Sequence, residues 1–294
     1  MKRSPLLFSL VGVGLALAPL PVEAQDQLSR KTASPVLAHQ TVVYLDLQTT
    51  TWRSRGRISY GIGPSLRMKL AAAGFTVTQD QATPRELTIK VDYREERGKP
   101  VSVSLFGTDI TCTVTLEHPE GGRLLDLKIH ESPTYAELVT APYLDVVERF
   151  QTNPYFYFLG DLIRGRIDAH LDTTGALIQA LERQLESERP RVVSPLDTLP
   201  SPADTFPDPD IFYAAAAREN AIEELGRLKD PRAVGILTKL TIHSDSQVRL
   251  RAVMALGKLG TPSARPTIEH VVQSDSDAKV RDAAAAVLPR FTGP

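Results

Sequence analysis

Ala217-Arg-Glu-Asn-Ala-Ile-Glu-Glu-Leu-Gly-Arg-Leu-Lys229 is the stretch that decides the fold of this chain, because the chain repeats it. It returns as Val248-Arg-Leu-Arg-Ala-Val-Met-Ala-Leu-Gly-Lys-Leu-Gly260, and in a more altered form as Val280-Arg-Asp-Ala-Ala-Ala-Ala-Val-Leu-Pro-Arg-Phe-Thr292. The copies start at residues 217, 248 and 280, so the offsets are 31 and 32 residues. A fixed period of this length predicts stacked helical repeats.

Each copy places small and apolar residues at helical spacing. Spacings of four and three bring such residues onto one face of a helix. The equivalent positions are Ala221, Leu225 and Leu228, then Ala252, Leu256 and Leu259, then Ala284, Leu288 and Phe291. Alanine allows a neighbouring helix to approach closely, and each fully buried leucine contributes about 1.5–3 kcal/mol. We expect this face to form the core of the array.

The ends of the helices are also marked in the sequence. The first helices should end near Lys229 and Gly260, and the second should begin at Asp230-Pro231 and Thr261-Pro262, where Asp or Thr precedes a proline. The second helices carry Leu237, Leu240 and Thr241, matched by Ile268, Val271 and Val272. We expect 244–246 and 274–276, both Ser-Asp-Ser, to close each unit and cap the next helix.

The repeated pattern resembles HEAT repeats, in particular the short bacterial kind of the phycobilisome lyases. The resemblance is carried by Val248-Arg249 and Val280-Arg281, by Leu-Gly at 225–226 and 256–257, and by Asp-Pro-Arg-Ala-Val at 230–234. It implies an all-α solenoid that binds proteins. The third copy has Pro289 in place of glycine and no second helix, so it is interpreted as a terminal half-repeat. An array this short is either marginally stable or covered at one end by another part of the chain.

The amino terminus indicates a secretory signal peptide. Basic residues precede an apolar run from Leu6 to Leu20, and Val22-Glu23-Ala24 offers small residues at the cleavage positions. We expect 1–24 to be removed, the mature chain to begin at Gln25, and the protein to be periplasmic or secreted without stable membrane insertion. An uncleaved membrane anchor is the alternative. The net charge of −1 gives no electrostatic argument for nucleic acid binding.

Between these segments the pattern predicts an α+β domain over 41–188, after a polar lead over 25–40. Strands are expected at 41–47, 75–78, 86–93, 101–105, 109–117 and 123–129, a polar loop at 49–59, a helix at 66–73, and helices at 143–150 and 160–188. Short Gly-rich turns favour an antiparallel sheet. The domain loosely resembles small domains of bacterial envelope proteins. A proline-rich linker, 189–210, should separate it from the HEAT-like repeats of 211–294. We expect the 160–188 helix, or the sheet beside it, to cover the first repeat.

Few residues suggest chemistry. Trp52, Arg53, Arg55 and Arg57 could contact an anion or a partner, although a solvated loop is the simpler interpretation. The aromatic run Tyr155-Phe-Tyr-Phe158 could be exposed for docking, but packing of a helix onto the sheet is favoured. The histidines have no metal-ligand spacing, and Cys112 is interpreted as a core residue.

These observations favour a non-enzymatic scaffold of the bacterial cell envelope that binds a protein partner. No catalytic, metal or cofactor residue is predicted. Two alternatives stay open, both with their site in the α+β domain: an enzyme, or a protein that binds a small molecule or a glycan. A pocket lined by converging acids or histidines in this domain would favour an enzyme, whereas a bare groove on the repeats would favour a scaffold.

Overall fold

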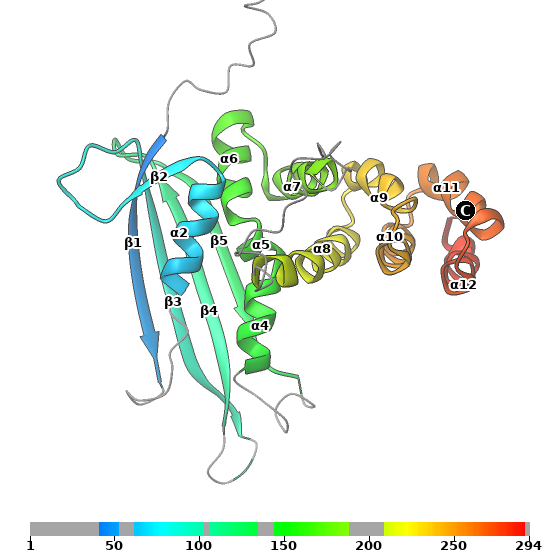
Figure 1. The fold of residues 1–294 in the computed structure, drawn as a ribbon, viewed down its shortest axis with the longest axis horizontal. Helices are drawn as coiled ribbons and strands as arrows, with labels where there is room; N and C mark the ends of the chain where they lie inside the picture. The colour runs from blue at the N-terminus through cyan, green and yellow to red at the C-terminus, as the bar shows by residue number, and fades with distance from the viewer. Residues whose placement is uncertain are drawn as a thin grey trace, which may run out of the picture. The chain divides into compact units, whose positions relative to one another are not determined.

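A computed structural model describes residues 41–52, 62–100, 102, 106–134, 144–187 and 209–291 (Figure 1). It has a five-stranded sheet with helices, followed by a helical region, so the expected fold class is confirmed. The expected signal peptide, the polar lead and residues 189–208 of the expected linker lie outside the described residues. All of the described residues belong to one compact unit.

The sheet is mixed rather than antiparallel. Its elements are β1 (Thr41–Thr51), α2 (Ile62–Ala72), β2 (Phe75–Thr78), β3 (Leu87–Pro100), β4 (Phe106–Glu117) and β5 (Arg123–Glu131), with strand order β2-β1-β3-β4-β5. The prediction of antiparallel pairing is right for β3, β4 and β5 and wrong for β1, which pairs parallel with both β2 and β3. The cause is α2, which returns the chain to the start of β1, so that β2 runs in the same direction.

Alternating residues of the strands form the core of this region. Side chains of one sheet face are buried, among them Leu45 of β1, Ile89 of β3, Val114 of β4 and Leu127 of β5. Helices α2, α4 and α6 supply Leu66, Phe150, Leu162 and other buried residues of the same core. The residues between them along each strand are mostly polar and lie on the other face, as expected for a sheet with one covered face.

Two boundaries differ from the sequence-based expectation. β1 continues to Thr51 through residues expected to form a loop, because threonine suits a strand and the pairing with β3 continues to Glu95. Helix α2 begins at Ile62, four positions before the expected start at residue 66. Gly74, with φ 81°, follows its end as predicted.

The long helix expected over 160–188 is wrong. The chain there forms two helices, α6 (Leu159–Ala169) and α7 (Thr173–Ser187), which follow the short α5 (Pro154–Tyr157). The helix expected over 143–150 is present as α4 (Leu144–Thr152). Gly175, the weak point predicted from the sequence, lies inside α7. The break falls at His170, whose φ of 52° ends α6, while the Asp172 side chain accepts a hydrogen bond from the Gly175 amide at 2.8 Å. Apolar residues continue at helical spacing through residue 171, so the sequence pattern did not indicate this break.

The repeats follow the predicted pattern closely. They consist of α8 (Pro209–Leu228), η3 (Pro231–Ala233), α9 (Val234–Leu240), α10 (Ser246–Leu259), η4 (Pro262–Ala264), α11 (Arg265–Ser274), α12 (Ala278–Val287) and η5 (Leu288–Phe291). Helix α8 already begins at Pro209, inside the segment predicted to be a linker, because proline is tolerated in the first turn of a helix. The predicted core residues Ala221, Leu225, Ala252, Leu256 and Ala284 are fully buried.

The predicted caps are right in part. Asp230 and Asp245 accept hydrogen bonds from the amides of Arg232 and Gln247, whereas Thr261 makes no side-chain cap bond. The cap of α12 is Asp277 instead of the predicted 274–276. The second offset is one residue longer than the first, and this extra residue moves the cap.

Candidate functional site

The first helices of the repeats stack through glycine. A Cβ on Gly226 of α8 would lie 2.8 Å from Ala255 Cα, and one on Gly257 of α10 would lie 2.6 Å from Val287 Cγ1. Real Cβ atoms essentially never come this close, so both contacts need glycine. The equivalent residue of the third copy is the exposed Pro289. A further helix cannot pack there at the same distance, so this kind of stacking ends at α12.

A nearly buried ion pair holds the loops between repeats. Arg249 Nε and Nη2 donate to the two carboxylate oxygens of Asp275, both at 2.9 Å, and its Nη1 donates to the carbonyl of His243 at 2.9 Å. The exposed fractions of the Arg249 and Asp275 side chains are 11% and 5%. The hydrogen bond from Arg249 is the main cause that lowers the pKa of Asp275 below its ordinary 3.8. The Val-Arg pair of the repeat therefore joins successive loops.

Helices α4, α5 and α7 cover the start of the array by contacting α8. The Tyr155 hydroxyl of α5 donates to the carboxylate of Glu224, and Asn220 Nδ2 donates to the carbonyl of Thr152 at 3.0 Å. Burial raises the pKa of Tyr155, and the bond to Glu224 raises it further. Burial raises the pKa of Glu224, but hydrogen bonds from Arg227 and Tyr155 outweigh this and leave it lowered. Glu224 therefore stays a charged acceptor at this contact.

Helix α7 occupies the place of a second helix in a repeat before the first. It contacts α8 and α9, as α9 contacts α10 and α11 contacts α12, and Figure 1 shows α7, α9 and α11 in one row. Asp172 accepts from Arg232 Nη2 at 2.7 Å, and Glu182 from Lys239 Nζ at 2.7 Å. These exposed ion pairs contribute little to the free energy of unfolding. They join the start and the middle of α7 to the second half of the first repeat. The expected cover of the first repeat is thus present, formed by α7 together with α4 and α5.

The outer surface of the repeats is mostly charged. Arg251 and Lys258 of α10 pair with Glu219 and Glu223 of α8 at 2.7–3.5 Å. Among the repeat side chains whose burial is described, two large apolar ones are exposed: Ile242, in the turn after α9, at 79%, and Met254, on α10, at 43%. Such positions do not contribute to the core, so they are available to a partner.

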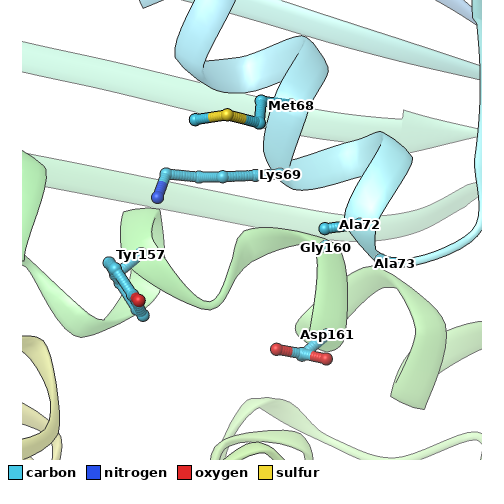
Figure 2. A pocket seen from close by; sticks show the side chains of 7 residues that line it. All are labelled: Met68, Lys69, Ala72, Ala73, Tyr157, Gly160 and Asp161. Carbon is cyan, nitrogen blue, oxygen red and sulfur yellow. The ribbon is translucent and has the colours of Figure 1, made fainter. Parts of the chain in front are cut away.

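A small pocket lies between α2, α5 and α6 (Figure 2). Its volume is about 180 Å³, and its lining residues are Met68, Lys69, Ala72, Ala73, Tyr157, Gly160 and Asp161. The Lys69 ammonium lies 4.2 Å from the centre of the Tyr157 ring, and Asp161 pairs with Arg183 at 2.8 Å. Pockets for small organic ligands usually measure about 300–1,000 Å³. The pocket is therefore small for a ligand, and its charged groups have protein partners.

The sequence-predicted site is only partly described. Trp52 directly follows β1 with 38% of its surface exposed, and Arg53, Arg55 and Arg57 lie outside the described residues. The aromatic run packs as favoured: Phe156 and Phe158 are buried, and Tyr155 and Tyr157 are partly buried. Sequence analysis missed the contact of Tyr155 with Glu224, because no pattern joins residues so far apart in the chain.

The other candidate chemical groups are structural. Cys112 is fully buried, and burial raises the pKa of its thiol to about 12, so it is a core residue as predicted. Within the described ranges, no group of histidine, cysteine and acidic residues is arranged to hold a metal ion. The same ranges contain no helix long and apolar enough to span a bilayer.

Comparison with known proteins supports the helical region. A family model for HEAT repeats matches residues 213–289, which cover most of α8 to η5. No curated protein matches the chain. Residues 213–289 are therefore a HEAT-repeat region, and such repeats are in general scaffolds for protein interactions.

Proposed function

We propose that this chain is a non-enzymatic scaffold of the bacterial cell envelope, periplasmic or secreted, that binds a protein partner through its HEAT repeats. The observation that carries the proposal is the stack of α8, α10 and α12, closed by glycine contacts and covered at its start by α7. Repeats stacked in this way present rows of side chains that do not contribute to the core. The resemblance to the short bacterial HEAT repeats and the signal-like sequence of 1–24 support the envelope location.

The turns between repeats are the surface that we assign to the partner. Ile242 exposes 79% of an apolar side chain there, next to charged residues such as Lys239. A central apolar contact ringed by polar groups is the usual arrangement of a protein interface. The charges that we find on α8 and α10 pair with each other, so we do not place the interface on that side.

The test is site-specific photo-crosslinking in the organism that makes the protein. A photo-reactive residue replaces Ile242 in one version of the full chain and the exposed Met254 of α10 in the other. We expect one discrete crosslinked protein from position 242, recovered from the envelope fraction, and none from position 254. Equal crosslinking from both positions, or none from position 242, would contradict the assigned surface. Recovery from another compartment would contradict the location alone.

A further inference from the structure

A shallow hollow lies on the polar face of the sheet, opposite the face that the helices cover. Its volume is about 230 Å³, and its lining residues are Asp46, Gln48, Lys90, Val91, Asp92, Thr113 and Thr115. All of these except Val91 alternate with core residues along β1, β3 and β4, so they lie on the face away from the core. The hollow is therefore separate from the pocket between α2, α5 and α6.

The strand register arranges the six polar side chains as a grid of two rows. In the first row, Asp46 of β1 lies opposite Lys90 of β3, which lies opposite Thr115 of β4. The second row, two residues away along each strand, consists of Gln48, Asp92 and Thr113 in the same order. Neighbouring strands are about 4.8 Å apart, and the two rows are about 7 Å apart. A single ligand about 10 Å across therefore reaches side chains of all three strands.

Four of these side chains carry hydrogen-bonding groups that the protein does not use. In the part of the chain that the structure describes, no hydrogen bond or ion pair involves the side chains of Asp46, Gln48, Thr113 and Thr115. A carboxylate only accepts hydrogen bonds, whereas an amide and a hydroxyl both donate and accept. A ligand that replaces water in the hollow must therefore offer donors and acceptors at short intervals.

The other two polar side chains are already paired. Lys90 Nζ lies 2.6 Å from Glu117 Oε2, and Arg94 Nε donates to Asp92 Oδ2 at 2.9 Å. Among the described residues, Asp46 has no ion-pair partner, so its carboxylate is the unbalanced charge of the lining. The hollow therefore disfavours an anionic ligand.

The lining also lacks an apolar anchor for a protein partner. The large apolar side chains that are exposed in the described residues, none of which lines the hollow, are Trp52, Met68, Ile242 and Met254. The energy of a protein interface is usually concentrated in a few large side chains at its centre. The hollow therefore suits a polar, uncharged ligand better than a protein surface.

We propose that this hollow binds a neutral carbohydrate, whose hydroxyl groups donate to Asp46 and accept from Gln48, Thr113 and Thr115. Adjacent sugar hydroxyls both donate and accept and carry no charge, which matches the groups of the lining. Sites that enclose a small ligand usually measure about 300–1,000 Å³, so the hollow holds one unit of a longer glycan that lies across the sheet. This surface does not depend on the function proposed for the repeats.

The site binds the glycan without cleaving it. Glycoside hydrolysis uses two carboxyl groups that flank the scissile bond. The lining contains two, but Asp92 is held by Arg94, which leaves Asp46 alone to act on a sugar.

The test measures binding of the full chain to immobilised neutral oligosaccharides of glucose, mannose, galactose, xylose and N-acetylglucosamine, with polygalacturonate as the anionic probe. We expect at least one neutral probe to bind and polygalacturonate not to bind. Asp46→Asn should weaken binding about tenfold or more, as for a lost hydrogen bond to a charged group. Thr113→Val keeps the shape of the side chain and should weaken binding about threefold or more, because one hydroxyl is lost.

The matched control is Asp109→Asn. Asp109 lies on the same face of β4, four residues or about 13 Å from Thr113, and outside the lining. This variant should bind within about twofold of the wild type. In NMR spectra of the wild type, the bound probe should shift the amide signals of residues 46–48, 90–92 and 113–115 and leave that of Ile242 unchanged.

Three results would overturn the proposal: no binding of any neutral probe, equal binding by Asp46→Asn and the wild type, or amide shifts confined to other residues. Stronger binding of polygalacturonate than of the neutral probes would also overturn it. So would a photo-reactive residue at position 48 that crosslinks a protein in the producing cells, because this face would then be a protein interface.

Discussion

The sheet region and the repeat region build their cores in different ways. In the sheet, every second residue of a strand is buried, and helices α2, α4 and α6 cover that face from within the same region. In the repeats, the first helix of each repeat is buried by the first helix of the next repeat, through contacts that depend on Gly226 and Gly257. A sheet covered in this way needs no further cover for its apolar face, whereas a stack of repeats always leaves an apolar face at each end.

The apolar face is treated differently at the two ends of the stack. At the start, α4, α5 and α7 contact α8, so part of the sheet region serves as the cover. At the far end, the exposed residues Asp282 of α12 and Pro289 of η5 lie at positions equivalent to Glu219 and Gly226 of α8, which contact α10. The difference shows that stacking is stopped by the sequence of the last copy and started by a neighbouring region. The predictions below test whether the two regions are one folding unit.

The largest effect is expected from a cavity in the middle of the stack. Leu256 is fully buried, so Leu256→Ala should reduce the free energy of unfolding by about 2–5 kcal/mol. The matched control is Met254→Ala, two residues away and 43% exposed, which should cost less than about 0.5 kcal/mol. Chemical denaturation followed by circular dichroism measures both. Equal losses would show that the assigned faces of α10 are wrong.

Breaking the ion pair between loops should have the next largest effect. Arg249→Met leaves Asp275 without its main partner, and removal of one member of a nearly buried pair costs about 3 kcal/mol. Arg251→Met, which removes a half-exposed partner of Glu219, is the control and should cost less than about 1 kcal/mol. Thermal melting at neutral pH distinguishes the two variants.

The same pair makes stability depend on pH. The pKa of Asp275 is lowered in the folded protein, so its contribution is present above its ordinary value of 3.8 and is lost as pH falls through the folded value. Wild-type stability should therefore drop below about pH 4 by more than that of Asp275→Asn, which cannot titrate at this position. Parallel pH profiles for the two proteins would refute the assignment.

A smaller loss of stability is expected when a side chain is added at a glycine where two helices stack. Gly257→Ala places a methyl group 2.6 Å from Val287 Cγ1 and should cost about 1–3 kcal/mol. Gly235, on α9, has no atom within 4 Å of the position of an added Cβ. Gly235→Ala should therefore be neutral or stabilise by up to about 1 kcal/mol, from helix propensity alone. Both variants replace a helical glycine by alanine, so a difference in their stability reports the contact of the added methyl group with Val287.

The smallest effect concerns the contact between the regions. Tyr155→Phe removes the hydrogen bond to Glu224 and should cost about 1 kcal/mol. Glu182→Gln, at the exposed pair with Lys239, should cost less than about 0.5 kcal/mol. If one folding unit spans both regions, Tyr155→Phe lowers the unfolding midpoint of sheet and repeats together. A change confined to one region would argue for separate units.

The sequence predicts local features best. The repeats, their core faces and the Asp230 and Asp245 caps depend on residues a few positions apart, and they are right. The break at His170 was missed, because the left-handed residue there is neither glycine nor asparagine and the apolar stripe continues past it. The parallel pairing of β1 was missed because it depends on where α2 returns the chain, which strand patterns do not encode.

The candidate surfaces were less accessible to sequence analysis. The covered start of the stack was expected from the small number of repeats, but its contacts, Tyr155 with Glu224 and Asp172 with Arg232, join distant parts of the chain. The continuation of β1 to Thr51 could not be foreseen, because residues 49–51 read as a polar loop. Pairing with β3, rather than the residues themselves, makes that segment a strand.

The most direct test of the account is urea unfolding of the full chain with two probes. Trp52, the only tryptophan, directly follows β1 and reports on the sheet by fluorescence, while circular dichroism at the helical band reports on all helices, including those of the repeats. Because α4, α5 and α7 join the two regions, both probes should follow one transition with the same midpoint and slope. Two separated transitions, with the repeats unfolding independently of the Trp52 signal, would contradict the claim that the sheet region is the cover of the repeat stack.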